Sequence, residues 1–135
     1  MIDVFKYFKT IMIVDDDADM TEVLKDKLEM EGFNVIVQNN GCDAIRVAES
    51  VRPDLIIIDI MMPCIDGIEL HKELKRRPLL KSIPALFLTG LKKRNEGKRE
   101  RVLAKPFDFE EVMKNIDELT TRSDDNAGNS RRAER

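Results

Sequence analysis

Short apolar runs alternate with amphipathic stretches along most of the chain. Five of these runs have the length of a strand, and most are bounded by Gly, Pro or Asp. They cover residues 10–15, 33–38, 54–59, 83–89 and, more weakly, 101–104. Runs of this kind, separated by helical stretches, are typical of βα units that build a parallel sheet with helices on both faces. The pattern therefore predicts an α/β fold with a doubly wound, parallel, five-stranded sheet.

The helical pattern is strongest in two of the amphipathic stretches. The first predicted helix begins after Asp17, whose side chain can cap it, and ends before Gly32. Its apolar face consists of Met20, Val23, Leu24 and Leu28. The last predicted helix has an apolar stripe at helical spacing, made of Phe109, Val112, Met113, Ile116 and Leu119. Shorter patterns of the same kind predict helices over residues 43–50 and 66–77.

The two ends of the chain differ from its middle. With 135 residues the chain has the length of one domain, which we place at residues 10–120. Residues 1–9 form an N-terminal extension that is apolar enough to lengthen the first strand or to contact another surface, such as a second copy of the chain in a homodimer. Residues 121–135 cannot bury enough apolar area to fold, which predicts a disordered tail or a truncated linker.

Charge and composition narrow the class of protein. The 23 basic and 26 acidic side chains nearly cancel, so no overall field favours nucleic acid or a membrane surface. The apolar runs are far shorter than the roughly 20 residues that a membrane span needs, and no leader pattern precedes them, which predicts a cytoplasmic protein. Cys42 and Cys64 lack metal-ligand spacing and a secretory context, so we expect two reduced thiols.

Polar side chains follow four of the predicted strands at the point where each strand ends. The first strand ends in Asp15-Asp16-Asp17, the third in Asp59, the fourth in Thr89 and the fifth in Lys105. Because the carboxyl ends of parallel strands meet at one edge of a sheet, these residues are expected to share a pocket. Carboxylates held that close repel each other unless a hard cation lies between them. The sequence therefore predicts a Mg²⁺ site, with a phosphate-bearing ligand and Lys105 as a second positive charge.

These residues resemble the receiver domain of two-component response regulators, the CheY-like superfamily, over residues 10–120. The matching motifs are Val14-Asp15-Asp16-Asp17, Asp59-Ile60-Met61-Met62-Pro63 with Asp66-Gly67 downstream, Leu88-Thr89-Gly90, and Lys105-Pro106-Phe107. The resemblance implies a flavodoxin-like (βα)5 fold with strand order 2-1-3-4-5. It also implies that Asp59 is the phosphoacceptor and that Mg²⁺ is held by Asp16, Asp59 and the backbone carbonyl of Met61, with Asp15 acting through water.

The implied function is that of a signalling domain, not an enzyme in the usual sense, that assists its own phosphorylation and dephosphorylation. A histidine kinase or a histidine phosphotransfer protein would supply the phosphoryl group to Asp59, and Lys105 and Thr89 would contact it. Phosphorylation would then change the binding of a downstream protein at the face formed by the fourth and fifth helices. We expect no direct DNA-binding domain in this chain and no membrane partner.

Two features depart from the family's pattern on the output side. Val102 stands three residues before Lys105, where the family usually has an aromatic ring that moves with the threonine. Only fifteen residues separate Thr89 from Lys105, and a basic run occupies residues 92–101, which predicts a shortened or irregular fourth helix. Two alternatives therefore stay open: a non-switching interaction module of the receiver fold, and a phosphorelay intermediate within a hybrid kinase system.

Other interpretations of the acidic residues fit less well. The spacing from Asp15 to Asp19 matches the start of an EF-hand loop, but Met20 replaces the loop glycine. A phosphatase of the haloacid dehalogenase type needs a second Asp two residues after the nucleophile, where Met61 stands, and a cap domain for which the chain has no room. An Asp59 that merely ends a strand would leave the other polar strand ends unexplained.

Overall fold

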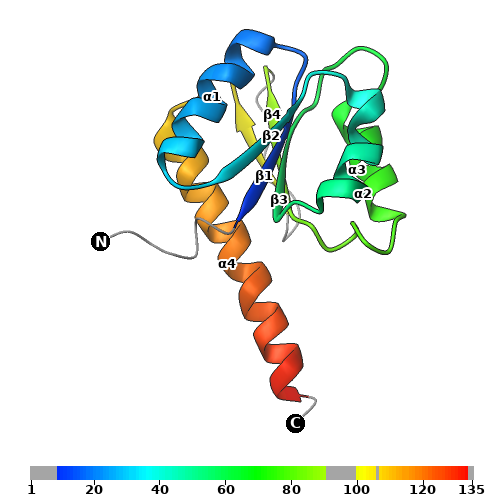
Figure 1. Cartoon of the computed structure of the whole chain (residues 1–135), viewed down its shortest axis with the longest axis vertical. Coiled ribbons are helices and arrows are strands. Elements are labelled where there is room, and N and C mark those ends of the chain that lie inside the picture. Colours follow the sequence, from blue (N-terminus) through cyan, green and yellow to red (C-terminus); the bar gives the residue numbers. More distant parts are fainter. Residues whose placement is uncertain (1–8, 91–99, 106, 134–135) are drawn as a thin grey trace.

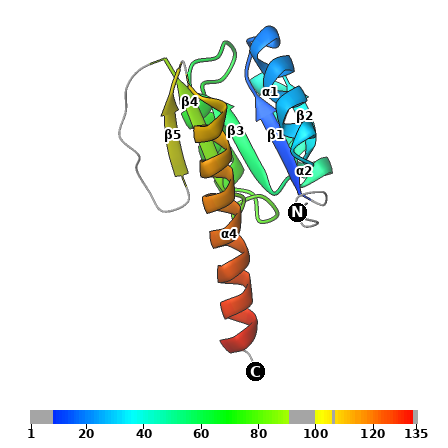
Figure 2. The same cartoon turned by 90° about the vertical axis from the view of Figure 1, so that its left-hand side faces the viewer.

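The sheet has five parallel strands. The computed structural model describes residues 9–90, 100–105 and 107–133 of the chain. The strands are β1 Thr10–Val14, β2 Asn34–Gln38, β3 Leu55–Asp59, β4 Ala85–Thr89 and β5 Glu100–Ala104. Their order across the sheet is β2-β1-β3-β4-β5 (Figure 2), with a parallel register between every pair of neighbours. The predicted doubly wound α/β fold and its strand order are confirmed.

The helices form a layer on each face of the sheet (Figure 1). They are α1 Ala18–Met30, the short 3-10 turn η2 Gly41–Asp43, α2 Ala44–Val51, α3 Gly67–Lys75 and α4 Phe109–Ala133. α1 and α4 pack on one face, and α2 and α3 pack on the other. Alternate residues of a strand point to opposite faces, so Ile57 lies in the first core and Ile56 and Ile58 in the second. Both faces are covered, which explains why the strands are apolar throughout rather than at every other position.

Side-chain caps begin the helices where the sequence predicts them. The Met20 N–H donates to the Asp17 carboxylate over 3.1 Å at the start of α1, and the Glu69 N–H donates to Asp66 over 2.8 Å at the start of α3. Gly32 follows α1 with a φ of 99°, a conformation that glycine adopts without steric cost. Asp17 is thus committed to α1 and stands apart from the acidic cluster described below.

The C-terminal segment differs from the prediction. The backbone of α4 continues to Ala133, so residues 121–133 are helical where the composition predicts a disordered tail (Figure 2). The prediction considered only the apolar area that the segment could bury. A helix that is already nucleated on the sheet extends at little cost, and residues 107–133 contain no proline to stop it. The predictions for residues 1–8 and for the connection at 91–99, including the irregular fourth helix, lie outside the described residues.

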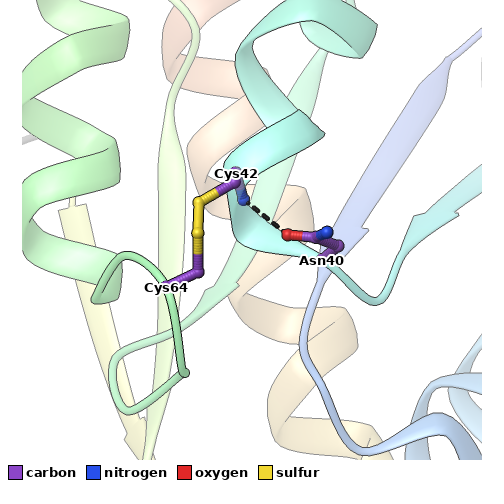
Figure 3. The surroundings of a disulfide bond; sticks show 3 residues. All are labelled: Asn40, Cys42 and Cys64. Atoms are coloured by element: carbon purple, nitrogen blue, oxygen red, sulfur yellow. Dashed lines mark hydrogen bonds between the residues drawn. A yellow bond between two sulfur atoms is a disulfide. The ribbon is translucent and has the colours of Figure 1, made fainter.

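The prediction of two reduced thiols is wrong. Cys42, in η2, and Cys64, in the loop after β3, form a disulfide with Cα atoms 6.2 Å apart (Figure 3). That separation lies within the range that a disulfide requires. The sequence argument considered compartment and local spacing, whereas the fold brings the two residues, 22 positions apart, to neighbouring segments at the same edge of the sheet.

Candidate functional site

Four polar residues gather at the carboxyl-terminal edge of the sheet. Asp15 directly follows β1, Asp59 ends β3, Thr89 ends β4 and Lys105 directly follows β5. These strands are neighbours in the order β1-β3-β4-β5. The side chains of Asp15, Asp59 and Thr89 are buried, while Asp16 is exposed. The structure thus brings together the candidate residues that the strand ends predict.

Three carboxylates lie within reach of one ion. One carboxylate oxygen from each of Asp15, Asp16 and Asp59 lies within 4.8 Å of the other two. Lys105 Nζ is 3.0 Å from Asp15 Oδ2 and 3.6 Å from Asp59 Oδ2. Three negative charges less one positive charge leave a formal charge of about −2 in the pocket, which one divalent cation balances.

The acidic cluster shifts the pKa of Asp59. The pKa of Asp59 is raised from 3.8 to about 6, first by burial and then by the charge of Asp15, which together outweigh the opposing effects of Lys105 and of a hydrogen bond from the backbone N–H of Met61. That N–H lies 3.3 Å from Asp59 Oδ1. Asp59 therefore takes up a proton at about pH 6, well above the usual range of a carboxylate, so the pocket favours a ligand that brings positive charge.

Lys105 is held as a cation against the carboxylates. Burial alone lowers the pKa of Lys105, but the hydrogen bond to Asp15 and the charges of Asp15 and Asp59 outweigh burial and raise the pKa above its usual value. The backbone N–H of Lys105 also donates to the carbonyl of Thr89 over 2.6 Å. This bond fixes the end of β5 to the end of β4 and aims Lys105 into the pocket.

Asn39 supports the pocket and was missed by the sequence analysis. Its side-chain amide donates to the backbone carbonyl of Asp15 over 2.7 Å and to Thr21 Oγ1 over 3.1 Å. Asp15 is held from the other side by the Asp17 N–H, which donates to Asp15 Oδ1 over 2.9 Å. The signal was present in the sequence, because Asn39 directly follows β2 and so lies at the same edge of the sheet as the acidic residues.

Gly67 allows the loop after β3 to close tightly against the strand. Its N–H donates to the Ile60 carbonyl over 2.8 Å, and a Cβ atom at this position would lie 2.8 Å from Ile60 Cα and closer still to the Asp59 carbonyl. Any side chain would therefore push α3 away from the end of β3. This is the physical reason for glycine in the Asp66-Gly67 pair and it sets the position of residues 60–66 beside Asp59.

The remaining predicted residues lie around the pocket. The backbone of Met61 is bonded to Asp59, while its side chain is 64% exposed at the rim. Val102 pairs with Phe87 on the neighbouring strand and packs against the core on the α2 and α3 face. An aliphatic side chain therefore occupies the position where the resemblance implies a mobile ring.

The donor set suits a hard cation. Carboxylate oxygens are the ligands that Mg²⁺ prefers, and one or two carboxylates with water and a phosphate complete its usual octahedral shell. The raised pKa of Asp59 and the formal charge of about −2 both favour the binding of a positive charge between the carboxylates. Fold and pocket together define a flavodoxin-like domain with an acidic cluster at the carboxyl-terminal edge of its sheet.

The response regulator receiver domain model matches residues 11–117. The chain therefore belongs to the response-regulator receiver family. Solved receiver domains have the same fold: the receiver domain of the Francisella response regulator 1452 superposes with a TM-score of 0.77 at 29% identity, covering 85% of this chain and 98% of that one. The receiver domain of a signal transduction histidine kinase from Syntrophus aciditrophicus superposes with a TM-score of 0.75 at 32% identity, covering 84% and 90%.

Curated relatives are named as regulators of transcription. The probable transcriptional regulator ycf29 of Pyropia yezoensis is 38% identical over 83% of this chain and 53% of its own length. The DNA-binding dual master transcriptional regulator RpaA of Synechocystis is 32% identical over 84% of this chain and 50% of its own length. The chain thus spans about half the length of the curated relatives that it matches.

The expectation of no direct DNA-binding domain is corrected by these relatives. The relatives carry the same domain within proteins about twice as long whose names state a role in transcription or DNA binding. Separately, no helix among the described residues is long and apolar enough to cross a membrane.

Proposed function

We propose that this receiver domain accepts a phosphoryl group on Asp59 from a histidine kinase of a two-component system, with Mg²⁺ in the pocket. The observation that supports this proposal most directly is the meeting of Asp59 with two further carboxylates and Lys105 at the edge of the sheet. An ordinary helix-capping aspartate would need neither a charged lysine within 3.6 Å nor two acidic neighbours. The site therefore fits an acceptor whose charge must be neutralised during transfer.

The chemistry assigned to the chain is an in-line displacement at phosphorus. A carboxylate oxygen of Asp59 attacks the phosphorus of a phosphohistidine, the P–N bond breaks, and the imidazole nitrogen leaves with the electron pair. Lys105 supplies positive charge to the transferred group's oxygens, and the Thr89 hydroxyl is available to donate a hydrogen bond to one of them. Each of these side chains comes from a different strand end, so the sheet fixes their relative positions.

Four groups are proposed to hold the cation. Asp16, Asp59 and the backbone carbonyl of Met61 would bind Mg²⁺ directly, and Asp15 would act through water. When bound, the ion supplies charge neutralisation for the carboxylates and for the incoming phosphoryl oxygens. Asp15 has a further task, because its carboxylate orients Lys105 by a hydrogen bond of 3.0 Å.

Phosphorylation is proposed to switch the binding of a partner. The phosphoryl group adds negative charge beside Lys105 and Thr89, so both side chains would move toward it. β4 and β5 are joined at this end through the Lys105 N–H and the Thr89 carbonyl, so a movement of one affects the other. A cytoplasmic location belongs to the same proposal, because the phosphodonor and acceptor must meet in one compartment.

Two other functions are favoured by particular observations. Val102 removes the ring that the family's switch uses, which favours a module whose binding does not depend on phosphorylation. One structural relative is the receiver domain of a histidine kinase, which favours a phosphorelay intermediate in a hybrid kinase system. A partner pulldown with and without beryllofluoride, an acyl-phosphate mimic, distinguishes the non-switching module from a phosphorylation-dependent switch. Transfer of the phosphoryl group from Asp59 back to a histidine phosphotransfer protein would identify a phosphorelay intermediate.

The first test of the proposed function is intact mass after incubation with acetyl phosphate and Mg²⁺. We expect the wild-type protein to gain one phosphoryl group only when Mg²⁺ is present, and Asp59→Asn to gain none. Asp26→Asn, which removes an exposed carboxylate on α1 that is not part of the Asp15, Asp16 and Asp59 cluster, is the matched control and should behave as wild type. A phosphoryl group that persists in Asp59→Asn would overturn the assignment.

A further inference from the structure

The disulfide joins the two segments that flank the acidic pocket on one side. Cys64 lies in the loop between β3 and α3, five residues after Asp59, and Cys42 lies in η2, just after β2 (Figure 3). Both cysteines belong to residues exposed at the surface. The bond is therefore accessible to small oxidants and reductants while being attached to the walls of the site.

Each of the two segments also contacts the pocket directly. On the Cys64 side, the Met61 N–H donates to the Asp59 carboxylate over 3.3 Å. On the Cys42 side, Asn40 caps η2 by accepting the Cys42 N–H over 2.9 Å, and the adjacent Asn39 donates to the Asp15 carbonyl over 2.7 Å. A covalent path thus runs from Asp59 through the disulfide to Asn39, and a hydrogen bond continues it to the backbone of Asp15.

The two segments also touch each other at Gly41. Gly41 packs against Ile65 and the end of Met62: a Cβ atom on Gly41 would lie 2.8 Å from Ile65 Cγ2 and 3.3 Å from Met62 Cε. Cys64 itself has a φ of 76°, a left-handed conformation that a residue with a Cβ atom adopts at some cost. The loop therefore holds a backbone conformation that the disulfide helps to retain.

We infer that Cys42 and Cys64 form a reversible thiol–disulfide site that controls the order of the β3–α3 loop and, through it, the cation-binding pocket. This inference rests on the proposed function, because the pocket that the disulfide would regulate is taken to be the phosphoacceptor site. In the oxidised form, residues 60–66 are held in place beside Asp59. In the reduced form, the loop is released to relax around Cys64.

The chemistry is thiol–disulfide exchange with a small-molecule disulfide as the oxidant. One cysteine thiolate attacks the disulfide RSSR, which forms a mixed disulfide and releases one RS⁻. The second cysteine thiolate then attacks the bonded protein sulfur, forming the Cys42–Cys64 bond and releasing a second RS⁻. The two cysteines lose two electrons and RSSR gains them, and a dithiol reverses the reaction with the same balance.

Compartment favours a reversible bond over a permanent one. Structural disulfides are rare in reducing compartments, and those found there are usually transient, catalytic or redox-sensing. A receiver domain that meets its kinase in the cytoplasm would carry an exposed, accessible disulfide of the second kind. Because the bond lies beside the pocket, its formation or reduction can change the pocket.

The test compares oxidised and dithiothreitol-reduced wild-type protein, after removal of the reductant, with Cys42→Ser treated identically. Thiol alkylation and intact mass establish the redox state. Hydrogen exchange of residues 60–66 and calorimetric Mg²⁺ binding then measure the loop and the pocket. Reduction is expected to speed loop exchange and weaken Mg²⁺ binding, each on the order of tenfold, the equivalent of about one residue's backbone freedom. Cys42→Ser should not respond to the reductant.

Equal exchange rates and equal Mg²⁺ affinities in the two redox states would overturn the inference, as would protein that oxidised glutathione cannot convert to the disulfide. Phosphorylation by acetyl phosphate is followed in the same samples. If neither redox state gains a phosphoryl group, the proposed function fails, and the exchange and Mg²⁺ measurements still decide whether the disulfide controls the loop.

Discussion

The two halves of the pocket are built differently. The acidic half, on β1 and β3, is tied down by many contacts: Asn39 on the Asp15 backbone, the Met61 N–H on Asp59, the tight approach at Gly67 and the nearby disulfide. On the β4 and β5 half, the Lys105 N–H donates to the Thr89 carbonyl, and Val102 stands where the family usually has a ring. The polar residues at the strand ends therefore match the family on both halves, whereas the departure at Val102 lies outside the acidic cluster.

Lys105→Met tests the largest contribution of the β4 and β5 half to phosphoryl transfer. Lys105 lies 3.6 Å from Asp59, so its loss should slow phosphorylation by acetyl phosphate by about 100-fold or more, the size of effect seen when one stabilising charge is removed from a transition state. Mg²⁺ should bind more tightly, because the competing cation is gone. Lys114→Met, at an exposed position on α4, is the control, and an equal loss of rate in it would contradict a specific role for Lys105.

Two glycines, one on each half of the pocket, test how closely the atoms around them are packed. Gly67→Ala places a methyl group within 2.8 Å of Ile60 Cα and should cost about 1–3 kcal/mol of unfolding free energy, measured by urea denaturation. A Cβ atom on Gly90 would meet no atom of the described residues within 4 Å, so Gly90→Ala should change stability by less than about 0.5 kcal/mol. Equal effects from the two substitutions would remove the contrast between the halves.

Acidification should weaken the binding of Mg²⁺ by the acidic half of the pocket. Mg²⁺ requires the ionised form of Asp59, whose pKa in the cation-free protein is about 6 because of burial and the charge of Asp15. Affinity should be level above pH 7 and fall by about tenfold from pH 7 to pH 5, since a proton then competes with the ion. The fold responds with the opposite sign: the raised pKa means that the folded state gains stability relative to the unfolded state as pH falls from 6 toward 4.

Calorimetric titration at several pH values measures this dependence. Asp59→Asn should bind Mg²⁺ more weakly and lose the pH dependence in that window, while Asp26→Asn should retain it. An unchanged slope in Asp59→Asn would assign the titration to another group.

Val102→Tyr is expected to have the smallest effect on the acceptor chemistry. Val102 packs against the α2 and α3 core and is not part of the Asp15, Asp16 and Asp59 cluster, so the phosphorylation rate should change by less than about twofold. Binding of a partner should change instead, measured as the ratio of affinities with and without beryllofluoride. A large change in phosphorylation rate would show that the two halves are coupled.

Much of this architecture follows from periodicity and strand ends. The runs around Ile11 and Leu55 predict their strands to within a residue or two, because strands buried on both faces have no polar interruption. The meeting of Asp15, Asp59 and Lys105 follows from the same argument, since parallel strands end at one edge. Bonds between segments that are distant in sequence do not follow, as Asn39 and the Cys42–Cys64 pair show. The extension of α4 was missed because propagation of a helix depends on its nucleus and not on local composition.

The disulfide has a consequence for the chain as a whole. Residues 42–64 form a covalently closed ring, and α2 and β3, the strand that carries Asp59, lie entirely within it. A ring of that size restricts the unfolded chain and stabilises the folded one by about 3 kcal/mol. The oxidised domain would therefore melt at a higher temperature and persist longer against proteolysis. The thiol balance of its surroundings would set how long the molecule survives as well as how its pocket is shaped.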